Sequence, residues 1–80
     1  MQKTLYSAEY EAFRAWLVSK RQEKNLTQRA LAALLDSPNS LVAKVEQGER
    51  RLDVIEFVYF CKKLEIDPKE GVELVARLMA

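Results

Sequence analysis

The 80-residue sequence carries 13 basic and 12 acidic side chains, one cysteine and no histidine, for a formal net charge of +1. A chain of this length predicts one small domain that buries roughly 60% of the surface its unfolded form exposes. A lone cysteine excludes an intrachain disulfide, the missing histidine argues against a His/Cys metal site, and no cofactor is expected. The start of the chain has no apolar run long enough for a signal peptide or a membrane span, so no membrane partner and a cytoplasmic location are expected.

Charge is unevenly distributed along the chain. Between Arg14 and Arg51, eight basic and four acidic residues leave a net +4, and the rest of the chain carries a net −3. Such segregation suits a domain that presents one face to a polyanion, although a solvated helix surface can also reach this imbalance.

The first helix is expected to begin after Ser7 as its N-cap and to run to about Lys24, with Asn25 as a left-handed residue beyond its end. One face of this helix is apolar and aromatic, formed by Tyr10, Phe13 and Leu17 with Trp16 beside them.

The second and third helices are short and separated by a tight break. Thr27 is expected to cap the second helix, whose inward residues are Ala30, Leu31, Leu34 and Leu35. Either Ser37 or Asp36 caps the third helix, and Pro38 stands near its first position, where a missing N–H costs nothing. Gly48 ends that helix.

The fourth and fifth helices each follow an acidic cap. Asp53 and Glu56 form a capping box that opens the fourth helix, with apolar residues at Val54, Phe57, Val58, Phe60, Cys61 and Leu64. "VIEFVYF" is β-prone by composition, but the capping box favours a helix. The pair Asp67-Pro68 opens the fifth helix, so the prediction is an all-α fold of five helices.

The stretch "TQRALAALLDSPNSLVAKVEQGER" resembles the lambda-repressor/Cro-type (XRE-like) helix-turn-helix family. The residues that fall in register with its pattern are Gln28, Leu31, Ala32, Val42, Val45, Glu46 and Gly48, and the resemblance covers about two-thirds of the chain. It implies a single five-helix lambda-repressor-like DNA-binding domain over residues 1–80, with the helix-turn-helix at about 27–47. Asp36 departs from the family, which prefers glycine at this turn, but aspartate tolerates the left-handed conformation.

The resemblance also implies which residues meet DNA. The third helix lies in the major groove in this family, so base contacts are expected from Asn39, Ser40, Ala43 and Lys44. Asparagine can bond bidentately to adenine and lysine can reach guanine. The alternatives are helix-cap chemistry for Asn39 and Ser40 and a solvated side chain for Lys44.

Phosphate contacts are expected from Gln28, Arg29, Arg50 and Arg51, at the start of the second helix and after the third. The arginines of "GERR" could equally belong to a solvated loop. The family also implies a salt bridge between Arg21 and Glu46 that joins the first and third helices; the alternative is two solvated surface charges.

The fifth helix carries more apolar surface than a small core needs. A homodimer interface is therefore expected at the C-terminal helix, about 68–79, through Val72, Val75, Leu78 and Met79, with the rest of the helix packed on the fourth. The alternative is that all four residues pack within one chain. Tyr6, Trp16 and Tyr59 fit either the interface or the core.

These features predict a sequence-specific regulator of bacterial or phage origin that binds double-stranded DNA as a dimer on a palindromic operator, as a repressor or controller. The alternative is an antitoxin-like or adaptor protein that uses the same fold mainly to bind protein. An enzyme is the least favoured class, because the sequence has no histidine, no glycine-rich phosphate loop and no credible carboxylate pair. Cys61 is interpreted as a small buried hydrophobic residue.

Overall fold

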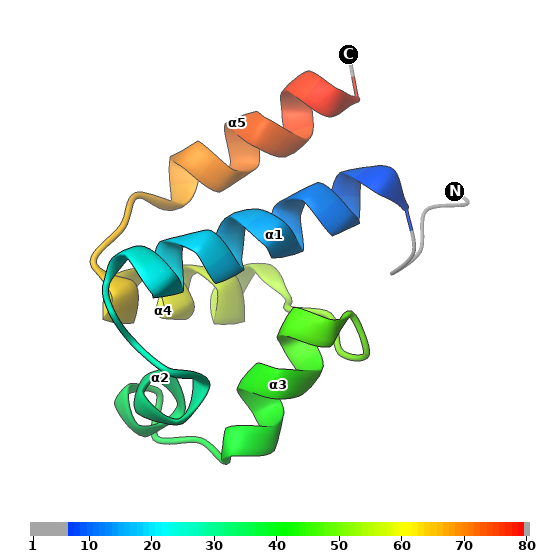
Figure 1. Cartoon of the computed structure of the whole chain (residues 1–80). Coiled ribbons are helices and arrows are strands. Elements are labelled where there is room, and N and C mark those ends of the chain that lie inside the picture. The colour runs from blue at the N-terminus through cyan, green and yellow to red at the C-terminus, as the bar shows by residue number, and fades with distance from the viewer. Residues whose placement is uncertain (1–6, 80) are drawn as a thin grey trace.

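The computed structural model describes residues 7–79, which form five α-helices and no strand (Figure 1). The helices are α1 Ala8–Glu23, α2 Gln28–Leu34, α3 Asn39–Gln47, α4 Val54–Leu64 and α5 Pro68–Leu78. The predicted all-α architecture is therefore confirmed. Tyr6 lies outside the described residues.

Four of the five helices begin at a side-chain cap. Ser7, Thr27, Asp53 and Asp67 each accept a hydrogen bond from a backbone N–H two or three residues further on. Glu56 completes the capping box by accepting the backbone N–H of Asp53 at 2.9 Å. These caps were predicted because their chemistry is local in sequence.

The start of α3 differs from the prediction. Neither Asp36 nor Ser37 caps it: Pro38 occupies the N-cap position with φ −65° and ψ 149°, and it makes no side-chain cap bond. The Ser37 hydroxyl instead donates to the carbonyl of Leu35, so it completes the end of α2. The extended ψ of Pro38 places this residue just before the helix rather than inside it.

Left-handed residues end three segments as the sequence indicates. Asn25 has φ 60°, Asp36 has φ 54° and Gly48 has φ 85°. Glu65, with φ 58°, ends α4 without any such sequence signal. Its conformation lets the N–H of Ile66 bond to the carbonyl of Cys61 at 3.0 Å while Ile66 packs against the core.

The core is built by α1 to α4. Its buried members are Leu17, Leu31, Ala32, Leu35, Val42, Val45, Phe57, Phe60, Cys61 and Leu64. The inward placement of Leu34 was wrong, because this side chain is exposed. On the short α2, the buried face is set by Leu31 and Leu35, one turn apart, and Leu34 is rotated away from it.

Helix α5 packs chiefly along α1 rather than on α4, contrary to the prediction (Figure 1). Gly71, the buried residue of α5, permits this approach, because a Cβ atom there would lie 2.8 Å from a ring carbon of Trp16. An ion pair between Lys20 and Glu70, 3.2 Å apart, joins the same two helices. Trp16 thus packs against the core, whereas Tyr59 is exposed.

Candidate nucleic-acid interface

Helix α3 has one buried side and one polar side. Val42 and Val45 are fully buried against the core, whereas Asn39, Ser40 and Lys44 are exposed. Ala43 is half-buried beside them. The side exposed to solvent therefore offers an amide, a hydroxyl and an ammonium group, which are the donors and acceptors that read base edges.

Gln47 extends this polar side and was missed in the sequence analysis. It is exposed, and it follows Ser40 and Lys44 at the i+7 and i+3 spacing that places residues on one face of a helix. That spacing was the signal that could have found it.

A buried ion pair fixes α3 against α1. Arg21 Nε lies 2.7 Å from Glu46 Oε2, and its second nitrogen Nη2 lies 3.0 Å from Glu46 Oε1. The two side chains are only 11% and 8% exposed. Arg21 also donates to the carbonyl of Leu26 at 2.6 Å, which ties the α1–α2 connection to the same pair.

Gln28 belongs to this pair as a third member. Its amide Nε2 donates to Glu46 Oε1 at 2.9 Å, so α1, α2 and α3 meet at a single carboxylate. The side chain expected to contact phosphate is therefore already bonded within the domain. We call Arg21, Gln28 and Glu46 the Glu46 lock.

Arg14 holds the same C-terminal end of α3 through its backbone, and no motif in the sequence indicates this role. Its Nη1 donates to the backbone carbonyl of Glu46 at 3.0 Å, near the C-terminal end of the helix. A Cβ atom on Gly48 would lie 2.8 Å from the guanidinium carbon of Arg14, so glycine is required here for space as well as for its φ of 85°. A contact across 32 residues leaves no local sequence pattern.

The two arginines after α3 lie in different surroundings. Arg50 forms a bidentate pair with Glu56, at 2.7 and 3.3 Å, and Arg50 lowers the pKa of the Glu56 carboxyl, with a smaller effect from the backbone N–H of Asp53. The guanidinium of Arg51 lies over the ring of Tyr10, 5.7 Å from its centroid. The guanidinium of Arg50 is therefore held by a carboxylate, whereas that of Arg51 lies on an aromatic ring.

The start of α2 has backbone N–H groups with no acceptor in the helix itself. Thr27 satisfies the backbone N–H groups of Ala30 and Leu31 through its hydroxyl and carbonyl oxygens. The N–H groups of Gln28 and Arg29 precede them in the first turn, where a helix has no acceptor of its own. The Arg29 side chain is exposed and forms no ion pair with the described residues.

Other kinds of site are not found in the described part of the chain. Residues 7–79 contain no group of three or more cysteine, aspartate or glutamate residues that could hold a metal ion. None of the five helices is both long enough and apolar enough to cross a membrane.

Comparison with known proteins agrees with this geometry. The sequence matches the helix-turn-helix family HTH_3 over residues 17–70, a range that includes all of α2, α3 and α4. The structure is similar to that of an XRE-family like protein from Pseudomonas syringae pv. tomato str. DC3000, with a TM-score of 0.83 and 40% sequence identity over 91% of this chain and 89% of that one. A search of curated proteins gave no match.

Proposed function

The chain belongs to the XRE-type helix-turn-helix family HTH_3, a family of DNA-binding domains, and we propose that it is a sequence-specific regulator of transcription. It binds double-stranded DNA as a homodimer on a palindromic operator, in the cytoplasm of a bacterium, as a repressor or controller.

The observation that carries the proposal is the rigid support of a polar helix face. An exposed helix that reads bases must hold its side chains at a fixed angle to the duplex, and α3 is fixed by the Glu46 lock near its end and by Val42 and Val45 on its inner side. We assign the base contacts to Asn39, Ser40, Ala43 and Lys44, and we add Gln47.

Phosphate contacts surround this face. Arg29 and the adjacent backbone N–H groups lie at the start of α2, and Arg51 lies in the loop after α3. Gln28 contributes through its backbone, because Glu46 holds its side-chain amide. Arg50 reaches a phosphate only by leaving Glu56, so its contribution is reduced by the loss of that pair.

The experiment begins with selection of bound duplexes from a random DNA pool, followed by affinity measurements on the selected site and its single-base variants. Lys44→Ala is expected to lose about 1–3 kcal/mol of discrimination at one base pair. Lys62→Ala is the matched control, because Lys62 is also an exposed helical lysine but belongs to α4. The assignment of Lys44 fails if Lys44→Ala, like the control, retains the affinity and the base preference of the wild type.

The dependence of DNA affinity on salt concentration distinguishes the phosphate contacts from the base contacts. Arg29→Ala and Arg51→Ala are expected to weaken binding to every sequence by a similar factor and to reduce the salt slope by about one ion each. A changed base preference in either variant would mean that the arginine reads bases instead.

A homodimer completes the proposal, because two recognition helices match half-sites roughly 34 Å apart on a palindrome. Val72, Leu78 and Met79 are exposed on α5 and Val75 is half-buried, which leaves apolar surface for a second chain. The same exposed surface favours the second candidate function, a protein-binding adaptor of the antitoxin type. If the protein is such an adaptor, it should cause no gel shift of any duplex from the selection, even at low salt.

A further inference from the structure

Tyr10 of α1 lies beneath the loop that joins α3 to α4. The guanidinium carbon of Arg51, in this loop, lies over the Tyr10 ring at 5.7 Å from its centroid, and the Arg51 side chain is exposed. Figure 1 shows the loop, residues 48–53, on the same side of the molecule as the start of α1. A long side chain that binds a partner loses conformational entropy unless a neighbour already restricts it, and Tyr10 is placed to supply that restriction.

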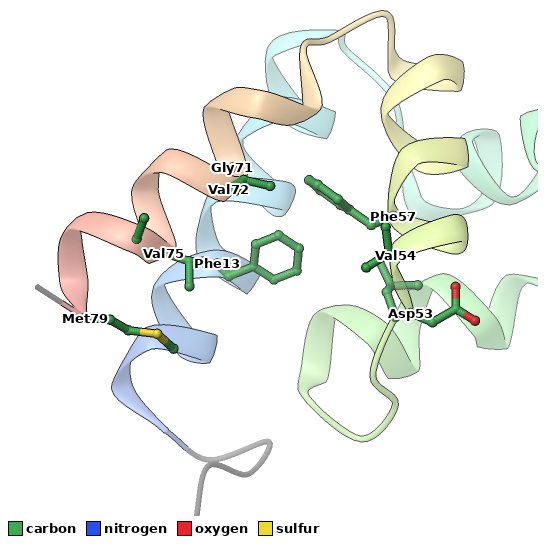
Figure 2. Close-up of a pocket in the computed structure, with 10 residues that line it drawn as sticks. Phe13, Asp53, Val54, Phe57, Gly71, Val72, Val75 and Met79 are labelled. Carbon is green, nitrogen blue, oxygen red and sulfur yellow. The ribbon is translucent and has the colours of Figure 1, made fainter. Parts of the chain in front are cut away.

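The ring of Tyr10 is a firm support because the core holds it. Its hydroxyl oxygen is buried, and its ring centroid lies 5.6 Å from that of Phe13. Phe13 in turn lies 5.1 Å from Phe57 of α4, edge to face, and Figure 2 shows these two rings facing each other at the apolar pocket between α1, α4 and α5. The ring beneath Arg51 is thus part of the packed aromatic face of α1.

The start of the loop is fixed on the same face of α1. Arg14 lies one turn after Tyr10, and its Nη1 donates to the backbone carbonyl of Glu46 at 3.0 Å. Gly48 lies so close to the Arg14 guanidinium that a Cβ atom would have no room. The chain therefore leaves α3 in contact with α1, one turn away from Tyr10.

The backbone at Arg51 is fixed as well. Arg50 forms its bidentate pair with Glu56, and its Nη1 also donates to the carbonyl of Arg51 at 2.9 Å. Because the backbone position is set, the contact with the Tyr10 ring restricts the direction in which the Arg51 side chain leaves the loop.

We propose that Tyr10 is a positioning residue for DNA binding, because its ring holds the Arg51 guanidinium where it meets a phosphate. The inference rests on the proposed function, in which Arg51 contacts the DNA backbone. It assigns a role in recognition to a residue of α1 that lies outside residues 17–70, the part of the chain that matches the helix-turn-helix family.

An aromatic ring suits this role better than a carboxylate does. A ring attracts a guanidinium through its π face, whereas a carboxylate neutralises the charge and occupies the N–H donors. Arg50 shows the second arrangement and has to give up Glu56 before it binds a phosphate. Arg51 keeps its contact with Tyr10 while it donates to a phosphate in the plane of the guanidinium, so the cation is ordered in advance at little cost to its charge.

The first experiment compares DNA affinity for the wild type, Tyr10→Leu, Tyr10→Phe and Arg51→Ala, on the selected site and on an unrelated duplex. Tyr10→Leu is expected to weaken binding to both duplexes by about 2- to 5-fold, as the loss of an exposed cation–π contact implies. Tyr10→Phe keeps the ring and removes a hydroxyl that has no hydrogen-bond partner among the described residues, so it is expected to bind as tightly as the wild type.

Tyr59→Leu is the matched control. The ammonium nitrogen of Lys63 lies over the Tyr59 ring at 5.4 Å from its centroid, so this substitution removes a cation–π contact of the same kind from α4. It is expected to leave DNA affinity unchanged. Thermal unfolding verifies that every variant is folded at the temperature of the binding assay.

A double-mutant cycle distinguishes a positioning role from a structural one. If Tyr10 acts through Arg51, Tyr10→Leu has no further effect in an Arg51→Ala background, and the double variant has the salt slope of Arg51→Ala alone. Losses that add independently would overturn the inference, and so would a Tyr10→Phe variant that binds as weakly as Tyr10→Leu. An Arg51→Ala variant with wild-type affinity would overturn both the phosphate contact of Arg51 and the role of Tyr10.

Nuclear magnetic resonance of the free domain separates a failure of this inference from a failure of the proposed function. The Nε–H bond of Arg51 is expected to be more ordered in the wild type and Tyr10→Phe than in Tyr10→Leu. If duplexes bind but this order is the same in all three proteins, the proposed function stands and the positioning role falls. If the order depends on the ring but no duplex binds, the regulatory function falls, and the contact of Tyr10 with Arg51 is structural only.

Discussion

The Glu46 lock offers the sharpest test of the support for α3. Glu46→Gln keeps the size of the side chain and one carbonyl oxygen, but it removes the negative charge and replaces an acceptor by an NH₂ donor. Three donors point at this carboxylate: two nitrogens of Arg21, at 2.7 and 3.0 Å, and the amide of Gln28, at 2.9 Å. At least one of them loses its acceptor, and the guanidinium loses its counter-charge.

The magnitude follows from burial. Arg21 and Glu46 are 11% and 8% exposed at their side chains, so water cannot replace the lost partner. Removal of one member of a buried, hydrogen-bonded pair costs about 3–5 kcal/mol. The whole domain is expected to have a free energy of unfolding of roughly 4–12 kcal/mol, at about 0.05–0.15 kcal/mol per residue. The substitution should therefore remove a large part of the stability.

Thermal and urea unfolding followed by circular dichroism measure this loss. A loss of about 3 kcal/mol corresponds to a fall in Tm of roughly 12–24 °C for a domain of this size. Glu56→Gln is the matched control: Glu56 also forms a bidentate pair with an arginine, but its side chain is 36% exposed, so about 1 kcal/mol or less is expected. If Glu46→Gln melts within a few degrees of the wild type, the lock does not support α3 in the way described.

Three further predictions concern other parts of the domain. Gly48→Ala should lower the free energy of unfolding measured in urea by about 1–3 kcal/mol, because its φ is +85° and the new Cβ lies 2.8 Å from the Arg14 guanidinium carbon; an unchanged value would contradict the crowding. Cys61 is fully buried and burial raises the pKa of its thiol to about 11, so a thiol reagent at neutral pH should label it only at the rate of unfolding, and prompt labelling of the folded protein would be inconsistent with this packing. Arg50 lowers the pKa of Glu56, so the stability that this pair contributes is present above the ordinary glutamate pKa and is lost as the pH falls through the lowered value. The difference in urea midpoint between the wild type and Glu56→Gln should therefore vanish in acid. A difference that stays constant with pH would contradict this linkage.

The helices could be predicted because their boundaries are encoded locally. A cap such as Thr27 or Asp53 bonds to an N–H three residues away, and Asn25 reverses the chain through its own backbone conformation. Pro38 shows the limit of such rules: two polar residues precede it, yet neither caps α3, and the Ser37 hydroxyl donates instead to the carbonyl of Leu35. That acceptor lies only two residues back, so two local hydrogen-bonding options compete at this turn.

The site could be predicted only where the family pattern covers it. The pattern named Arg21 and Glu46, but it assigned the Gln28 side chain to phosphate, whereas the structure bonds it to Glu46. The contact of Arg14 with the end of α3 and the pairing of Arg50 with Glu56 have no period or motif. A short-range pattern shows which residues are polar, and only the packing shows which of those groups already have partners.

The position of α5 keeps its exposed apolar surface apart from α3 (Figure 1). Gly71 lets α5 settle on Trp16 of α1, and Val54 and Ile55 in the first turn of α4 remain exposed. A bulkier residue at position 71 would press on the rings of Trp16 and Phe57 and push α5 outward without touching α3. The proposed base contacts lie on α3 and the apolar surface proposed for the homodimer lies on α5, so substitutions on that surface should alter affinity for a palindrome while leaving the preference for bases within each half-site unchanged.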